Sequence, residues 1–232
     1  MEAWFEFLRE QPGLYWGFLG MLGAIAGSFA SAAIFRIPHP EYTLTRPARS
    51  QCPSCHTQIA WHDNLPILSY FLLRGRCRAC GVGYGPGYLV HELGLAALFL
   101  LAGASWAASA GWLALGIVLV ALTALWIAAA VDLRHFILPD GITIGGQWAA
   151  IPAILLVPEL HLWPGRESLP WGALLLGLDA DSAPRMIALA SGLVGWAAAF
   201  TISFGIGRLF SYLLRQEALG FGDVKYLAAV GA

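Results

Sequence analysis

The sequence predicts an all-α integral membrane protein, a multi-span helical bundle that carries one small polar domain. Of its 232 residues, 58% are hydrophobic and only 12% are charged, and the mean hydropathy is +0.67. These values are too apolar for an ordinary soluble domain. Several apolar runs reach the roughly 20 residues that cross a bilayer, and a segment in lipid must satisfy its own backbone hydrogen bonds. The runs therefore predict helices.

Six spans are predicted along the chain. They cover 14–35, 88–109, 111–131, 141–158 and 186–210, and the sixth begins near 219. The first follows the acidic leader "MEAWFEFLREQP", where a signal peptide would be basic, so it predicts an uncleaved anchor. The sixth apolar run stops at Ala232, and we expect the C-terminus to be truncated.

The basic residues predict the orientation, because Lys and Arg near helix ends favour the cytoplasm. Six of the thirteen lie at the mouth of, or within, the polar stretch 37–87: Arg36, Arg46, Arg49, Arg74, Arg76 and Arg78. The N-terminal segment is acidic. We therefore expect an outside N-terminus with the first helix in 1–36, a cytoplasmic domain in 37–87 and a transmembrane core in 88–232. With a net charge of −1, no nucleic-acid partner is expected.

All four cysteines lie in this polar stretch as two CxxC pairs. Cys52 pairs with Cys55 and Cys77 with Cys80, with 21 residues between the pairs. Two such turns present four thiolates to one ion, and the spacing resembles a zinc ribbon. Disulfides are rare in the reducing cytoplasm, and the haem-attachment pattern "CPSCH" would need the outer face. We expect structural zinc in a closed site that shapes a zinc-ribbon-like cytoplasmic domain without catalysing.

Three other patterns are interpreted structurally rather than functionally. The segment "WHDNLPILSYFLL" between the pairs is interpreted as ribbon core or an interfacial helix in preference to substrate contact. The segment "GVGYGPGY" is not a dinucleotide loop, since Pro86 holds the last position and no strand precedes it, and we expect a flexible linker. The small-residue runs "GMLGAIAGS" and "SGLVGWAAAF" predict close helix packing rather than a gap for substrate entry.

Ionisable residues at membrane depth are costly, so each is a functional candidate. Asp132 closes the third span and Asp223 opens the sixth, and the topology puts both on the cytoplasmic side although 91 positions (223 − 132) separate them. Two carboxylates at one site tend to hold one proton between them, which is the arrangement that activates water against a peptide carbonyl. A satisfied charge at a helix end is the alternative for each aspartate.

Residues near these acids are candidates for supporting roles. Gly220 and Gly222 would let the backbone and an extended substrate approach closely. Lys225 would stabilise an ionised Asp223, or only extend to the membrane surface. Asp140 follows Pro139 and is expected to N-cap the fourth helix, with support of catalysis as the alternative.

Five motifs together resemble the type IV prepilin peptidases: "GSFASAAIFRIP", "CPSC…CRAC", "WHDNLPILS", "VDLRHFILPD" and the GxGD-containing "GFGDVK". The similarity runs from about residue 24 to the end, although family members are commonly longer and have eight spans. The resemblance implies a bifunctional enzyme of the bacterial inner membrane. Such enzymes cut the basic leader from type IV prepilins or type II secretion pseudopilins on the cytoplasmic side, and then N-methylate the new N-terminus with S-adenosylmethionine.

The resemblance also implies roles for individual residues and partners. Asp132 and Asp223 would be catalytic, and the four cysteines would bind zinc. The region where the methyltransferase function is usually placed contains Arg49, Asp63 and Glu92. The partners would be the lipid bilayer, the hydrophobic helix of the substrate and its basic leader, which is expected to meet Glu41, Asp63, Asp140 and Glu217. Two alternatives are a proton-coupled transporter and a non-catalytic zinc-ribbon scaffold of a secretion system.

Overall fold

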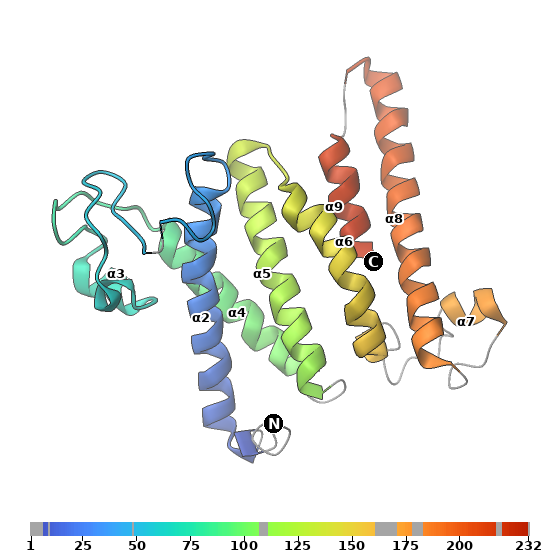
Figure 1. The fold of residues 1–232 in the computed structure, drawn as a ribbon, viewed down its shortest axis with the longest axis horizontal. Coiled ribbons are helices and arrows are strands. Elements are labelled where there is room, and N and C mark those ends of the chain that lie inside the picture. The colour runs from blue at the N-terminus through green and yellow to red at the C-terminus, as the bar shows by residue number, and fades with distance from the viewer. Residues whose placement is uncertain are drawn as a thin grey trace. The chain divides into compact units, whose positions relative to one another are not determined.

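The computed structural model describes residues 7–8, 10–47, 49–106, 111–160, 171–177, 183–216 and 220–231. The predicted all-α class is confirmed, because the described residues form helices and no strand, with only two isolated β-bridges, Gln51 to Gln58 and Arg76 to Gly83. The elements in chain order are α2 (Pro12–Arg36), η1 (Trp61–Asn64), α3 (Leu68–Leu73), α4 (Gly87–Trp106), α5 (Gly111–His135), α6 (Asp140–Leu156), η2 (Pro158–Leu160), α7 (Trp171–Leu176), α8 (Pro184–Leu214) and α9 (Phe221–Gly231) (Figure 1).

Each predicted span contains a helix, but the helices differ in length. Among the described residues, α2, α4, α5 and α8 are long and apolar enough to cross a membrane. The helix in the fourth predicted span, α6, has 17 residues, and the helix in the sixth, α9, has 11. At 1.5 Å per residue α6 is about 25 Å long, which is shorter than the hydrocarbon core of about 30 Å.

The chain divides into two compact units. The first contains Met1–Ala107 and Val118–Phe136, and therefore α2, α3, α4 and most of α5. The second contains Ala108–Ile117 and Ile137–Ala232, and therefore α6 to α9. The predicted division into a first helix, a cytoplasmic domain and a transmembrane core stays a prediction.

Small residues let α2 and α4 pack closely in the first unit. A Cβ atom built on Gly23 would lie 2.6 Å from Cα of Ala96, and one built on Gly27 would overlap the backbone of Glu92. Spacing of small residues by four is the usual means by which membrane helices bring their backbones together. Leu19 is fully buried beside these glycines on α2. The run "GMLGAIAGS" therefore serves helix packing, as predicted.

Alanine at Gly27 is expected to destabilise the first unit, because even one methyl group there requires the two backbones to separate. Overpacking of this kind costs about 1–3 kcal/mol. Gly17 on the same helix is a matched control, since a Cβ built there meets nothing within 4 Å. Gly17→Ala should leave stability unchanged or raise it by about 0.5–1 kcal/mol. Thermal unfolding in detergent distinguishes the two variants, and equal midpoints would contradict this packing.

The second unit is held by a glycine contact and a short hydrogen-bond network. A Cβ atom built on Gly231 of α9 would lie 2.6 Å from the carbonyl oxygen of Gly195 on α8. Gln147 Nε2 on α6 donates to the carbonyl oxygen of Lys225 at 3.1 Å. Trp196 Nε1 on α8 donates to Gln147 Oε1 at 3.1 Å. These bonds fix the position of α9 between α6 and α8, and with it the position of the residues at the start of α9.

Candidate functional site

The two CxxC pairs form two turns of the same design, which we call the first knuckle (50–59) and the second knuckle (75–84). Each is closed by the same three backbone hydrogen bonds, shifted by 25 residues (77 − 52). In the first knuckle, the backbone N–H groups of Cys52, His56 and Ile59 donate to the carbonyl oxygens of Thr57, Cys52 and Ser50, respectively. In the second knuckle, those of Cys77, Gly81 and Tyr84 donate to the carbonyl oxygens of Val82, Cys77 and Gly75. The predicted linker "GVGYGPGY" is therefore wrong in part, because its first residues complete the second knuckle.

The four cysteine sulfurs lie close enough to hold one metal ion. All lie within 4.8 Å of one another, with 3.8 Å between Cys52 and Cys80 and 4.0 Å between Cys55 and Cys77. A tetrahedral ion with bonds of about 2.3 Å requires sulfurs about 3.8 Å apart. Hydrogen bonding to Thr57 lowers the pKa of Cys55 to about 6. In contrast, although a backbone hydrogen bond from Val82 lowers the pKa of Cys80, desolvation and the other three thiols raise it to about 12. The cluster fits a metal such as zinc.

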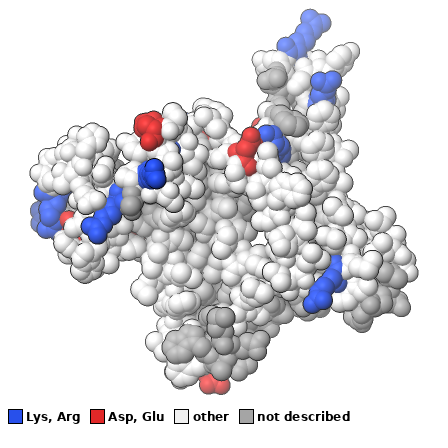
Figure 2. Space-filling view, viewed as in Figure 1, with Lys and Arg blue, Asp and Glu red and all other residues white. Residues whose placement is uncertain are grey.

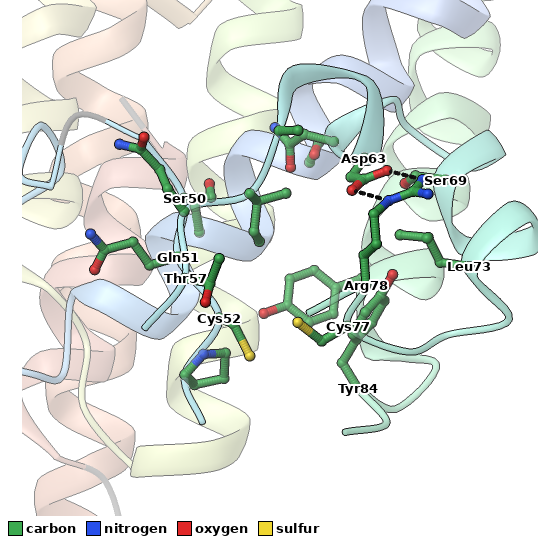
Figure 3. A pocket seen from close by; sticks show the side chains of 18 of the residues that line it. Ser50, Gln51, Cys52, Thr57, Asp63, Ser69, Leu73, Cys77, Arg78 and Tyr84 are labelled. Atoms are coloured by element: carbon green, nitrogen blue, oxygen red, sulfur yellow. Dashed lines mark hydrogen bonds and ion pairs between the residues drawn. The ribbon is translucent and has the colours of Figure 1, made fainter. Parts of the chain in front are cut away.

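A cavity of about 400 Å³ lies between the knuckles, the end of α2 and the start of α4. Its volume is in the range of small-molecule sites. Figure 3 shows side chains from both knuckles and from α3 around it, including Cys52, Ser69 and Tyr84. Sequence reasoning did not identify this cavity, because it is enclosed by segments from four parts of the chain.

Glu92 is the buried acid of the cavity. It lies on α4, is only 6% exposed, and its Oε2 accepts a hydrogen bond of 2.6 Å from the backbone N–H of Ile67. Arg36 also lines the cavity, at the last residue of α2. Its guanidinium donates to the carbonyl oxygens of Leu44 and Pro47 and thereby folds the chain that follows α2. Glu92 therefore brings an acidic group into a pocket in which Arg36 is bonded to the loop that follows α2.

Asp63 is held against the second knuckle by Arg78. The guanidinium donates two hydrogen bonds, of 2.7 and 2.6 Å, to the two carboxylate oxygens (Figure 3). The side chain of Asp63 is 9% exposed and that of Arg78 is 62% exposed. Hydrogen bonding from Arg78 holds the pKa of Asp63 below its ordinary value, although partial desolvation acts in the opposite direction. The pair ties η1 to the turn between Cys77 and Cys80.

Removing this pair is expected to weaken zinc binding a few-fold. Asp63→Asn and Arg78→Gln should reduce zinc affinity by similar factors. The double variant should lose no more affinity than either single variant, because each of the three variants removes the same contact. Since the pKa of Asp63 is lowered on folding, its contribution is present above the ordinary aspartate pKa and is lost as pH falls through the lower value. The effect should therefore be constant across neutral pH. Chelator competition measures the zinc affinity of each variant. Losses of affinity that add in the double variant would show that the two residues act separately and would contradict this prediction.

The two predicted catalytic aspartates lie at helix ends, one in each unit. Asp132 is in the last turn of α5, is partly exposed, and its carbonyl oxygen accepts the N–H of Phe136 at 2.8 Å. Asp223 is the third residue of α9, and its carboxylate accepts the N–H of Gly220 at 3.0 Å. This contact is half of a capping box, in which an acid in the first turn bonds back to the residue before the helix. The pairing of the two carboxylates stays a prediction.

The residues predicted to support Asp223 gather at the start of α9. A Cβ built on Gly222 would lie 3.4 Å from Cβ of Leu138, which is van der Waals contact with the segment before α6. Lys225 Nζ donates to Asp140 Oδ1 at 2.7 Å. The expected capping role of Asp140 is wrong, because Pro139 is the N-cap of α6 and Asp140 is the first helical residue. No pattern in the sequence predicts this ion pair, whose members are 85 positions apart.

The remaining predicted residues have different surroundings. Arg49 is exposed and does not line the cavity, whereas Asp63 and Glu92 do. Of the four acids expected to meet a basic leader, Asp63 and Asp140 are ion-paired and Glu41 is exposed. Glu217 lies outside the described residues.

Comparison with known proteins places both halves of the chain in one group. Residues 21–106 match the model of the bacterial peptidase A24 N-terminal domain, and residues 119–232 match that of the type IV leader peptidase family. A prepilin leader peptidase/N-methyltransferase of Klebsiella pneumoniae is 36% identical over 98% of this chain and 88% of its own length. A prepilin leader peptidase/N-methyltransferase of Pectobacterium carotovorum subsp. carotovorum is 30% identical over 98% of this chain and 77% of its own length.

A third relative has a different name. The type 4 prepilin-like proteins leader peptide-processing enzyme of Escherichia coli O78:H11 is 34% identical over 90% of this chain and 73% of its own length. No solved structure matches the chain.

Proposed function

Because this chain belongs to the type IV leader peptidase family, we propose that it removes the leader peptide of type IV prepilins or type II secretion pseudopilins and N-methylates the amino terminus exposed by the cut. The observation that carries the proposal is the family match over 119–232, which contains both Asp132 and Asp223. The four bilayer-length helices place the enzyme in a membrane, and we assign it to the bacterial inner membrane with its catalytic face toward the cytoplasm.

Leader cleavage is assigned to Asp132 and Asp223, which share one proton. The ionised carboxylate takes a proton from water as the oxygen attacks the scissile carbonyl, and the protonated carboxyl donates to the carbonyl oxygen. As the tetrahedral intermediate collapses, the carboxyl that took the proton from water donates it to the nitrogen of the leaving amine. The other carboxylate takes a proton from the hydroxyl group that re-forms a carbonyl. The hydrogen bond from the Gly220 N–H to Asp223 orients one of the two acids. The ion pair of Lys225 with Asp140 fixes the first turn of α9 against the start of α6.

N-methylation is assigned to the cavity beside the knuckles. S-adenosylmethionine would supply the methyl group of its sulfonium to an uncharged amine, and the neutral thioether S-adenosylhomocysteine would leave. The cavity has the volume for such a molecule, and its tyrosines, among them Tyr84 and Tyr88, offer surfaces on which an adenine can stack. The carboxylate of Glu92 binds the α-ammonium of the cut substrate and accepts its proton, which leaves the amine able to attack.

The metal has a structural role in this assignment. A site of four cysteines has no open position for a substrate or a water molecule. Residues of both knuckles, including Cys52 and Cys77, line the cavity. A bound zinc ion would therefore hold the cavity wall together.

The two assignments are separable by experiment. A peptide that begins with the mature N-terminal residue needs no cleavage, so it should be methylated equally by the wild type and by Asp223→Asn. Glu92→Gln keeps an acceptor for the N–H of Ile67 but loses the base, and it should slow methylation by about 10²-fold or more. Mass spectrometry of the peptide measures both. Equal methylation by Glu92→Gln and the wild type would overturn the role of Glu92.

A further inference from the structure

The helix α3 presents two different faces, although it has only six residues. Ser69, Tyr70 and Leu73 line the cavity. The other face consists of Leu68, Phe71 and Leu72, which are 53%, 64% and 68% exposed. Residues three and four apart lie on one side of a helix, so these three side chains form one apolar surface. We call it the outer face of α3. A cytoplasmic loop would not gain stability by exposing such a surface to water.

The position of α3 along the membrane helices explains this surface. The N–H of Ile67, immediately before α3, bonds to Glu92, which is five residues after the first residue of α4. At 1.5 Å per residue this is about 8 Å into a helix that crosses the membrane. In Figure 1, α3 lies at the level of the upper half of α2 rather than beyond its end. Interfacial helices bury their apolar face about 5–10 Å into the boundary between headgroups and acyl chains.

The charges next to α3 suit the surface of an anionic membrane. Arg74 and Arg76 follow the helix directly, and both are exposed. Figure 2 shows basic side chains over this part of the first unit. Trp61, in the preceding η1, is 79% exposed, and tryptophan is enriched at membrane interfaces. An apolar face, a tryptophan and flanking arginines are the composition of a segment that lies in the interface.

We propose that α3 is an interfacial anchor, with its outer face among the acyl chains and Arg74 and Arg76 on the phosphates of anionic lipids. The bilayer covers the outer face, and the cavity on the opposite side of the same helix is thereby held at the membrane surface. The apolar helix of a protein substrate is the other surface that could cover Phe71. Two observations favour lipid over a protein helix: the depth of Glu92 along α4, and the presence of Arg74 and Arg76 beside α3. A bilayer surrounds the membrane helices on all sides at the depth of Glu92.

Photo-crosslinking tests the anchor with a matched pair of positions. Phe71 and Tyr70 are adjacent aromatic residues on opposite faces of α3. Each is replaced by p-benzoylphenylalanine in the full chain, in vesicles of phosphatidylethanolamine and phosphatidylglycerol without substrate. We expect about tenfold more lipid adduct from position 71 than from position 70, because only the outer face is among acyl chains. Equal lipid adducts, or adducts from position 71 to protein alone, would overturn the proposal. Zinc content verifies that each variant is folded.

A second measurement tests the arginines and needs no crosslinker. Hydrogen exchange of 65–76 is compared between the wild type and the double variant Arg74→Gln, Arg76→Gln. Each arginine near an anionic surface should favour the bound helix by roughly fivefold. In vesicles that contain phosphatidylglycerol, the variant should therefore exchange faster than the wild type. In vesicles of phosphatidylcholine alone, the variant and the wild type should exchange at the same rate. The same difference in both lipids would show a structural role for the arginines and overturn the assignment to headgroups.

Discussion

Asp223→Asn is expected to reduce leader cleavage by at least about a thousandfold, because the variant loses one of the two groups that move protons at the scissile bond. Asp132→Asn should cause a loss of the same size. The double variant should be no worse than either single variant, since groups that act as a unit have strongly non-additive effects. The rate is measured as cleavage of a purified prepilin by the full chain in lipid vesicles.

Glu10→Gln is the matched control for both aspartates. Glu10 is an exposed carboxylate just before α2 and belongs to neither proposed site. The substitution Glu10→Gln should leave the rate of leader cleavage unchanged. Losses for Asp132→Asn and Asp223→Asn that multiply in the double variant would show two independent roles. Cleavage near the wild-type rate in either single variant would remove that residue from catalysis.

Replacing any one of the four cysteines with serine is expected to abolish stable zinc binding and methylation. Zinc sites of this kind contribute roughly 10–16 kcal/mol of apparent binding energy in small domains, and most of that energy is spent on folding the ligand loops. Because the knuckles are equivalent, Cys52→Ser and Cys77→Ser should behave alike. Hydrogen exchange should rise across 50–84, whereas α2 and α4 should stay protected by their own packing.

The metal content and the exchange rates of the same preparation test this prediction together. Ser50→Ala is a suitable control, because it changes a residue of the first knuckle without removing a thiolate or a backbone hydrogen bond. A cysteine variant that binds no metal but keeps wild-type protection of 50–84 would show that the knuckles fold without zinc.

The helices were predictable from the sequence because lipid imposes a simple rule. A long apolar run with few charges must form a helix, and α2, α5 and α8 each occupy such a run. The shorter α6 and α9 show the limit of this rule. Hydropathy alone does not fix their lengths, since Asp140 and Asp223 lie in their first turns and make specific contacts there.

The site was predictable only where its residues are close in sequence. The spacing of the cysteines predicted the cluster, and the aligned segments "CPSCHTQ" and "CRACGVG" contain a further signal, the repeat with an offset of 25 that makes the knuckles equivalent. In contrast, the pairing of Arg78 with Asp63 and of Lys225 with Asp140 depends on how separate segments meet. Each of these charged residues has several partners that are equally plausible by sequence alone.

The most direct test of the proposed function is the mass of one substrate before and after exposure to the wild-type chain. A prepilin is incubated with the full chain in lipid vesicles, with and without S-adenosylmethionine, and its mature fragment is weighed by mass spectrometry. We predict loss of the leader in both reactions and the added mass of one methyl group only with S-adenosylmethionine. An intact prepilin after incubation with a folded, zinc-loaded chain would contradict the proposed function.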